Sequence, residues 1–269
     1  MNRSYEYDRP ITIAEGVYWV GFYEEKTNLH CNPYLIVEGD EAVLIDSGSR
    51  PDFAVVMMKI LQAGLQPGQI KALIYQHYDP DLCGSMPNFV DIIDNPALKI
   101  ISDPLDRIFL TYYLGKENHP LLRSVNFTDR GFTFNGRKLR FVRTPYCHNA
   151  GSFVTYDAKT KTLFSGDLFG SFSKVWDLRL KLSSNCYTCG DYRNCPNQRE
   201  YCPLPDIITF HRKIMPTGKA LKYAMEQIRP LDIALIAPQH GGIISTREDI
   251  AFLIDKLANL ERVGIDAYL

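Results

Sequence analysis

Residues 75–84 read YQHYDPDLCG, and this segment decides the fold of the chain. It follows an apolar run at residues 72–75 that predicts a short buried strand. His77, Asp79 and Asp81 then stand at every second position. Because side chains two residues apart on an extended chain point to the same side, these three predict a metal site. The alternative is a polar surface turn after the strand, so the interpretation depends on residues further along.

Pro80 predicts the backbone conformation at the centre of this segment. A proline favours an extended conformation at the residue before it, which here is Asp79. We therefore expect the segment to stay extended and no helix to begin at Pro80.

Further candidate ligands come shortly after other apolar runs that predict strands. His148, Asp167 and His240 each lie at such a position. Loops at strand ends on one rim of a scaffold commonly carry the chemistry of a protein. A single histidine there is more often a hydrogen-bonded structural residue, but three histidines and three aspartates in such places favour a metal site.

The pattern of apolar residues predicts one α/β domain over residues 1–269. Many hairpins mixed with amphipathic helices indicate two sheets with helices outside them. Glu38–Glu41 and Asn135–Gly136 are predicted hairpin turns. Strands are predicted at residues 16–22, 33–37, 42–46, 72–75, 98–101, 132–134, 139–142, 152–156, 162–165 and 233–237, and helices at residues 51–63, 104–115, 219–227 and 247–263.

Composition and charge exclude several classes of protein. The net charge of -1 argues against a nucleic-acid partner or an anionic membrane surface recognised through bulk charge. Residues 1–8 lack the apolar core of a secretory signal, and no apolar run reaches the length of a membrane span. We therefore expect a cytoplasmic protein with no membrane partner.

Four of the seven cysteines fall in a segment at residues 183–206 that reads as an insertion rich in Cys, Asn, Pro and Tyr. The first two form a CxxC pair, which suits tetrahedral zinc or an iron–sulfur centre. We expect a second metal site here, with unmetallated thiols or disulfides as the alternative. The four are Cys186, Cys189, Cys195 and Cys202.

The candidate ligands and two further segments carry a resemblance to the metallo-β-lactamase superfamily. These segments are FHRKIMP at residues 210–216 and APQHG at residues 237–241. The chain most resembles the diiron domain of flavodiiron proteins, in which the usual His-x-His-x-Asp-His motif becomes His-x-Glu-x-Asp. The resemblance covers about residues 10–265 and implies an αββα metallo-β-lactamase sandwich with the Cys-rich segment as an insertion.

The resemblance implies a pair of irons. Replacing imidazole by carboxylate favours iron or manganese over zinc, and iron can cycle between Fe(II) and Fe(III), which zinc cannot. Such a pair can bind and reduce dioxygen or nitric oxide. The implied assignment gives the first iron His77, Asp79 and His148, gives the second iron Asp81 and His240, and makes Asp167 the bridge.

One position departs from the family pattern, and three residues outside the ligand set are expected to lie near the metals. Leu82 stands where the superfamily usually has histidine, which leaves an open position on the second iron. His30 is a candidate pocket residue or extra ligand, and Asp46 matches an aspartate that orients the metal loop by hydrogen bonding. His211 is expected to support the ligands or to be structural, and not to bind a metal itself. Asp79 and Leu82 in place of histidines argue against a dizinc hydrolase, which is the alternative within the superfamily.

Two functions remain open on this resemblance. The protein is either an O2 or NO reductase with an external electron donor, or an O2 sensor that signals to a partner protein. The chain ends at Leu269 without a flavodoxin-like domain, so we expect no FMN in it. The resemblance also implies a homodimer, although the flavin domain contributes to that contact in flavodiiron proteins.

Overall fold

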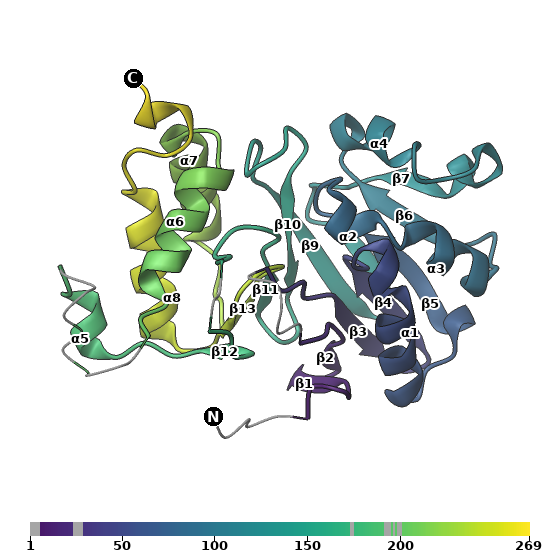
Figure 1. Cartoon of the computed structure of the whole chain (residues 1–269). Helices are drawn as coiled ribbons and strands as arrows, with labels where there is room; N and C mark the ends of the chain where they lie inside the picture. The colour runs from purple at the N-terminus through teal and green to yellow at the C-terminus, as the bar shows by residue number, and fades with distance from the viewer. Residues whose placement is uncertain (1–5, 24–28, 173–174, 191–194, 196, 198–200) are drawn as a thin grey trace.

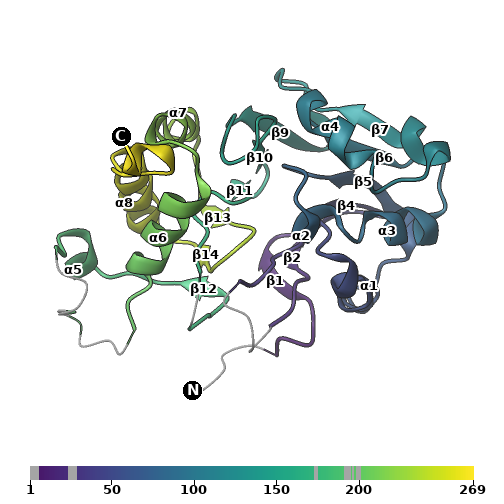
Figure 2. The same ribbon diagram turned by 45° about the horizontal axis from the view of Figure 1, so that its top comes forward.

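Within the described residues of the computed structural model, two seven-stranded sheets lie face to face with helices on their outer sides (Figure 1). The structure describes residues 6–23, 29–172, 175–190, 195, 197 and 201–269. Figure 2 shows the same order of layers from a second direction, helices, sheet, sheet and helices. This arrangement confirms the predicted αββα sandwich of the metallo-β-lactamase type.

The first sheet has the strand order β1-β2-β3-β4-β5-β6-β7. Its strands β4 and β5 are almost wholly apolar because both faces are covered. Val43 and Ile45 of β4 face the second sheet, whereas Leu44 packs under the helices. The strands are β1 (Ile11–Ala14), β2 (Val17–Trp19), β3 (Tyr34–Glu38), β4 (Glu41–Ile45), β5 (Ile70–Ile74), β6 (Lys99–Ser102) and β7 (Leu122–Ser124).

The second sheet has the order β12-β14-β13-β11-β10-β9-β8. Asn135 and Gly136 join β8 (Phe132–Phe134) to β9 (Arg137–Arg143). Their φ angles of 40° and 83° confirm the predicted hairpin turn. The strands are β8 (Phe132–Phe134), β9 (Arg137–Arg143), β10 (Phe153–Asp157), β11 (Thr162–Phe164), β12 (Arg179–Leu180), β13 (Leu235–Ala237) and β14 (Ile243–Ile244).

Helices cover both outer faces of the sandwich (Figure 1). On the first sheet lie α1 (Phe53–Gln62), α3 (Met86–Ile93) and α4 (Pro104–Leu110). The second sheet is covered by α6 (Leu204–Ile214), α7 (Gly218–Ile228) and α8 (Arg247–Ala258). Shorter elements are α2 (Pro80–Cys83), α5 (Ser184–Tyr187) and the 3-10 turns η1 (Arg50–Asp52), η2 (Pro67–Gln69), η3 (Lys116–Leu121) and η4 (Ile265–Ala267).

An apolar core between the sheets holds them in one orientation. Trp19 and Tyr34 of the first sheet share this core with Phe153 and Phe164 of the second. The rings of Tyr34 and Phe164 lie 5.3 Å apart between centroids. Because the sheets cannot shift independently, the loops that leave them at one rim are held close together.

The expectation that no helix begins at Pro80 is wrong. Asp79 is extended, with φ −66° and ψ 148°, as predicted, but Pro80 is the first residue of α2. Proline suits the first helical position because its missing N–H would have no intrahelical partner there. The segment after β5 is therefore a strand end, a turn and one helical turn rather than a continuous extended chain.

The sequence patterns did not predict α3 or α6, which complete the two outer layers. Part of the insertion, including α5, lies in the described ranges, and its remaining residues lie outside them. Across the part of the chain that the structure describes, we find no helix with the length and apolar character to cross a membrane.

Candidate metal centre

The six predicted ligands meet at one rim of the sandwich. Three come from the segment after β5 in the first sheet, and three come from loops that follow β9, β11 and β13 in the second. The rim is thus assembled from both halves of the chain. The six are His77, Asp79, Asp81, His148, Asp167 and His240.

The first ligand group combines imidazole and carboxylate. Ligand atoms of His77, His148 and Asp167 all lie within 4.8 Å of one another. His148 Nε2 is 3.1 Å from Asp79 Oδ2 and 3.2 Å from Asp167 Oδ2. His77 Nε2 is 3.6 Å from Asp167 Oδ1. Two nitrogens and two carboxylates therefore face a common point.

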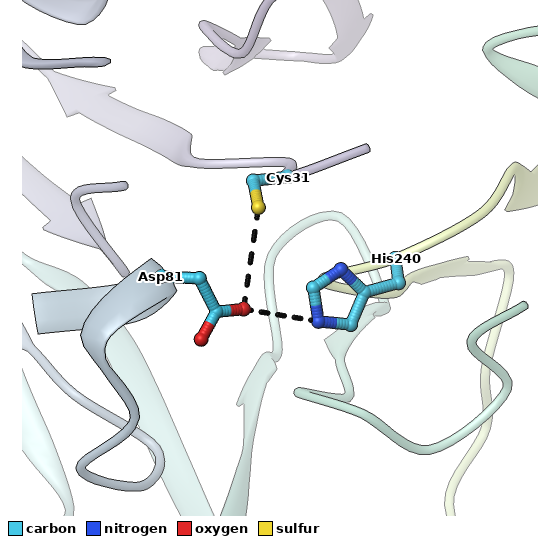
Figure 3. Close-up of side chains that lie close together, drawn as sticks. All are labelled: Cys31, Asp81 and His240. Carbon is cyan, nitrogen blue, oxygen red and sulfur yellow. Dashed lines mark hydrogen bonds and ion pairs between the residues drawn. The ribbon is translucent and has the colours of Figure 1, made fainter. Parts of the chain in front are cut away.

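The second ligand group includes a residue that the sequence analysis did not single out. Ligand atoms of Cys31, Asp81 and His240 lie within 4.8 Å of one another (Figure 3). His240 Nε2 is 3.1 Å from Asp81 Oδ2 and 3.5 Å from Asp167 Oδ1. Only the position of Cys31 next to His30 in the same loop could have pointed to this thiol.

Asp167 lies between the two groups. Its Oδ1 is 3.6 Å from His77 Nε2 and 3.5 Å from His240 Nε2, while its Oδ2 faces His148. Among the described residues this buried Oδ1 has no hydrogen-bond partner. A buried carboxylate oxygen without a partner is costly, so a cation is a fitting partner here. The donors suit two metal ions that share one carboxylate.

The charges of the rim couple the histidines to the aspartates. Burial alone would lower the pKa of His148, but the hydrogen bonds that it donates to Asp167 and Asp79 raise it to about 10. Burial would raise the pKa of Asp167, yet His77, His148 and His240 hold it below the usual range. Without metal, protons on His148 and His240 balance the carboxylates. Bound cations would replace those protons.

Asp46 supports the segment that carries the first ligands. Its carboxylate accepts hydrogen bonds from Gln76 N at 3.3 Å and Gln76 Nε2 at 3.4 Å. Burial raises the pKa of Asp46 to about 8 despite these bonds. Because Gln76 directly precedes His77, this contact anchors the chain at that ligand. That Asp46 orients the metal loop stays a prediction.

Asn149 orients Asp79, a contact that the sequence analysis did not foresee. Its Nδ2 donates to Asp79 Oδ1 at 2.9 Å, which leaves Oδ2 directed at His148. One carboxylate oxygen is thus held by the protein, and the other faces the first group. Only the position of Asn149 directly after a ligand could have pointed to it.

The ring of His30 does not join either ligand group in the described part of the chain. It stacks on Trp176 with 4.7 Å between ring centroids. Its backbone oxygen lies 3.0 Å from His240 Nδ1. His30 therefore contributes to the site through its main chain, and its expected role as a pocket side chain or ligand gains no support from this placement.

His211 holds the turn that follows Asp167. Its Nε2 accepts a hydrogen bond from Phe169 N at 2.9 Å, and its Nδ1 donates to Ile207 O at 2.7 Å. Burial lowers the pKa of His211 to about 4, so the ring is neutral at pH 7. It connects α6 to the loop of the shared carboxylate, as expected for a structural residue.

The insertion cysteines are less compact than the rim. None of them belongs to a ligand group with atoms within 4.8 Å of one another in the described ranges. No disulfide joins any of the seven cysteines, all of which the structure describes. The pKa of Cys202 is raised by burial and by the nearby Cys186, Cys195 and Cys189. Zinc or an iron–sulfur centre here stays a prediction.

Comparison with known proteins finds relatives across most of the chain. Residues 29–241 match the family model described as ODP family beta lactamase. The type A flavoprotein fprA of Rhodobacter capsulatus is 26% identical over 246 residues, which make up 87% of this chain and 52% of that protein. The anaerobic nitric oxide reductase flavorubredoxin of Enterobacter sp. strain 638 is 27% identical over 172 residues, or 60% of this chain and 35% of that protein. The chain thus spans about half or less of the length of these curated relatives.

A solved structure matches along nearly its whole length. It is a peroxy diiron species of the chemotaxis sensor ODP, with a TM-score of 0.72 and 23% sequence identity. The match covers 96% of this chain and 97% of that one. At this identity the likeness shows the shared fold.

Proposed function

The chain belongs to the family described as ODP family beta lactamase, and on this premise we propose that its rim holds a pair of irons and that the protein responds to dioxygen. The observation that carries the proposal is the carboxylate of Asp167. Its two oxygens face the two ligand groups, and Oδ1 lacks any other partner within the described ranges.

The donor atoms favour iron at both positions. The proposed ligands include more carboxylates than those of a dizinc hydrolase. Asp79 and Leu82 stand in place of two histidines, and the loss of these imidazoles shifts the metal preference from zinc toward iron. When bound, an iron pair supplies the Fe(II)/Fe(III) chemistry by which dioxygen or nitric oxide is bound and reduced. We assign His77, Asp79 and His148 to the first iron, Asp81 and His240 to the second, and Asp167 to both.

The burial of the ligands gives the rim a closed side and an open side. The side chains of His77, Asp167 and His240 are 2%, 5% and 4% exposed. Those of His148 and Asp79 are 20% and 30% exposed. The buried side chains exclude water from the inner face, and the partly exposed ones leave an approach for a diatomic molecule.

We favour a sensor over a reductase. Family membership and the match over 97% of the chemotaxis sensor ODP support sensing with a signalling partner protein. The flavoprotein and flavorubredoxin relatives support a reductase of O2 or NO with an external electron donor. The chain spans 52% of the length of the flavoprotein and 35% of the length of the flavorubredoxin.

Oxygen consumption separates these two functions. Iron-loaded, anaerobically reduced protein would be mixed with dioxygen, with and without rubredoxin or a flavin reductase as donor. A sensor is expected to consume a stoichiometric amount and to keep its changed optical spectrum for many seconds. Sustained consumption of O2 or NO at roughly 1–10³ per second would instead establish the reductase.

A further inference from the structure

Cys31 places a sulfur atom beside the two ligands of the proposed second metal (Figure 3). Its Sγ lies 4.0 Å from Asp81 Oδ2, which in turn lies 3.1 Å from His240 Nε2. Donor atoms on one cation, with bonds of about 2.0–2.3 Å, lie roughly 3–4 Å apart. We propose that Cys31 binds the second metal as a thiolate, in place of the imidazole that is missing at Leu82. This inference rests on the proposed metal pair.

The side chain of Leu82 does not face the rim. Leu82 is fully buried and packs in the core under the helices of the first sheet, with Tyr75 and Phe89. Its backbone oxygen accepts a hydrogen bond from Ser47 N at 2.8 Å. The second metal therefore lacks a ligand from α2 at that position, and the loop between β2 and β3 brings a sulfur to the same group.

Asn32, the residue after the thiol, fixes that loop against the loop of His240. Its side chain accepts from Trp19 Nε1 at 2.8 Å and donates to Pro238 O at 3.0 Å and Gly241 O at 2.9 Å. Asn32 is fully buried, so these bonds are shielded from water. The sulfur is held by a built structure and does not depend on a loose loop.

The same segment also orients His240. The backbone oxygen of His30 lies 3.0 Å from His240 Nδ1, which makes Nδ1 the donor and leaves Nε2 to bind a metal. One short stretch of chain therefore presents the thiol and sets the tautomer of the neighbouring imidazole. A metal-ligating histidine commonly needs such a partner on its second nitrogen.

A second, independent observation points to a cation at this place. The buried Oδ1 of Asp167, which has no hydrogen-bond partner among the described residues, lies 3.5 Å from His240 Nε2. With Cys31 and Asp81 it would complete a set of one sulfur, one nitrogen and two carboxylates. On metal binding the thiol would release its proton to solvent, and the thiolate would donate a sulfur lone pair to the metal.

Cys83 provides a matched control. It is fully buried and close to the rim, but its Sγ donates to Asp79 O at 2.9 Å and it belongs to neither ligand group. Removing this thiol should leave metal binding at the rim unchanged. The insertion cysteines are the same in every variant and contribute an equal background.

Cobalt(II) titration of the full chain without air tests the assignment. The measurements are thiolate-to-cobalt charge-transfer absorption in the near ultraviolet and bound cobalt per chain, with circular dichroism to verify folding. Cys31→Ser is expected to lose the absorption of one thiolate and to weaken the second cobalt at least about tenfold. Cys31→Ala should do the same, and Cys83→Ser should match the unmodified chain.

Two results would overturn the inference, and they differ. If Cys31→Ser and Cys31→Ala keep the full absorption and both cobalt ions, the thiol is not a ligand although the metal pair stands. If the unmodified chain and Asp167→Asn bind the same number of cobalt ions, the rim holds no pair, and the proposed function fails together with this assignment.

Discussion

Asp167 is the residue whose carboxylate lies between the two ligand groups of the rim. Three histidines hold its pKa below the usual range although burial works in the opposite direction. Its Oδ1 lies between His77 of the first ligand group and His240 of the second, and its Oδ2 faces His148 of the first. A change that keeps the shape of the side chain but removes its charge therefore tests the bridge directly.

Asp167→Asn should abolish binding of the metal pair, because an amide offers one weak oxygen donor in place of two charged ones. Asp106→Asn is the matched control, since Asp106 is also buried near the rim but lies outside both ligand groups. Metal content per chain by mass spectrometry checks both. Equal loss in the two variants, or no loss in either, would contradict the bridge.

Asp106 also gives a pH prediction. Burial raises its pKa to about 6, and Asp103 and Asp79 add to the rise, while a hydrogen bond from Gly151 opposes it. The folded chain therefore binds this proton more tightly than the unfolded chain does, because an aspartate in an unfolded chain has a pKa near 3.9. The contribution of Asp106 to stability is present below about pH 4 and is lost as the pH rises through about 6.

Asp106→Asn removes this dependence. At pH 7 the variant should be more stable than the unmodified chain by about 1–3 kcal/mol, and at pH 4 the difference should vanish. Urea unfolding of both proteins at the two pH values checks this, since other titrating groups cancel in the difference. A variant that is less stable at pH 7 would contradict the origin given for the raised pKa.

At the scale of elements, the sequence located the segment after β5 but misjudged its shape. His77, Asp79 and Asp81 converge because a turn leads into α2, not because alternate residues share one side of a strand. Residue spacing can identify candidate ligands that lie close together in the sequence. It cannot identify Cys31, whose place depends on how Asn32 joins two loops that are far apart in the chain.

The contact between α6 and the loop of Asp167 yields a further prediction. His211→Phe removes the acceptor for Phe169 N and leaves that buried N–H without a partner, which should lower the free energy of unfolding by about 1–3 kcal/mol. The metals should also bind more weakly because the turn loosens. Urea unfolding and metal titration measure both effects.

Lys213→Ala, an exposed position on the same helix, is the control and should change neither quantity. A His211→Phe variant as stable as this control would show that the histidine does not hold the turn.

At the scale of the whole molecule, the rim joins the two sheets. The sequence predicted the sandwich and pointed to six candidate ligands because apolar runs and strand-end polar residues recur along the whole chain. It could not predict that three ligands come from each sheet side, since the pairing of β11 with β13 depends on tertiary packing. A metal pair at this position would bridge both halves of the fold.

Metal should therefore stabilise the entire chain. At a free metal concentration a hundred times the Kd, binding to the folded state adds about 3 kcal/mol and raises the Tm. Thermal unfolding with and without iron(II), in the absence of air, checks this. Asp167→Asn should show no such rise, and an equal rise in that variant would assign the stabilisation to a site elsewhere.

The measurement that tests the central claim most directly is metal analysis combined with the optical spectrum of anaerobically reduced protein before and after exposure to air. We predict two irons per chain that Asp167→Asn does not bind, together with a new visible absorption band after air is admitted. Two zinc ions at the rim and an unchanged spectrum would contradict the account.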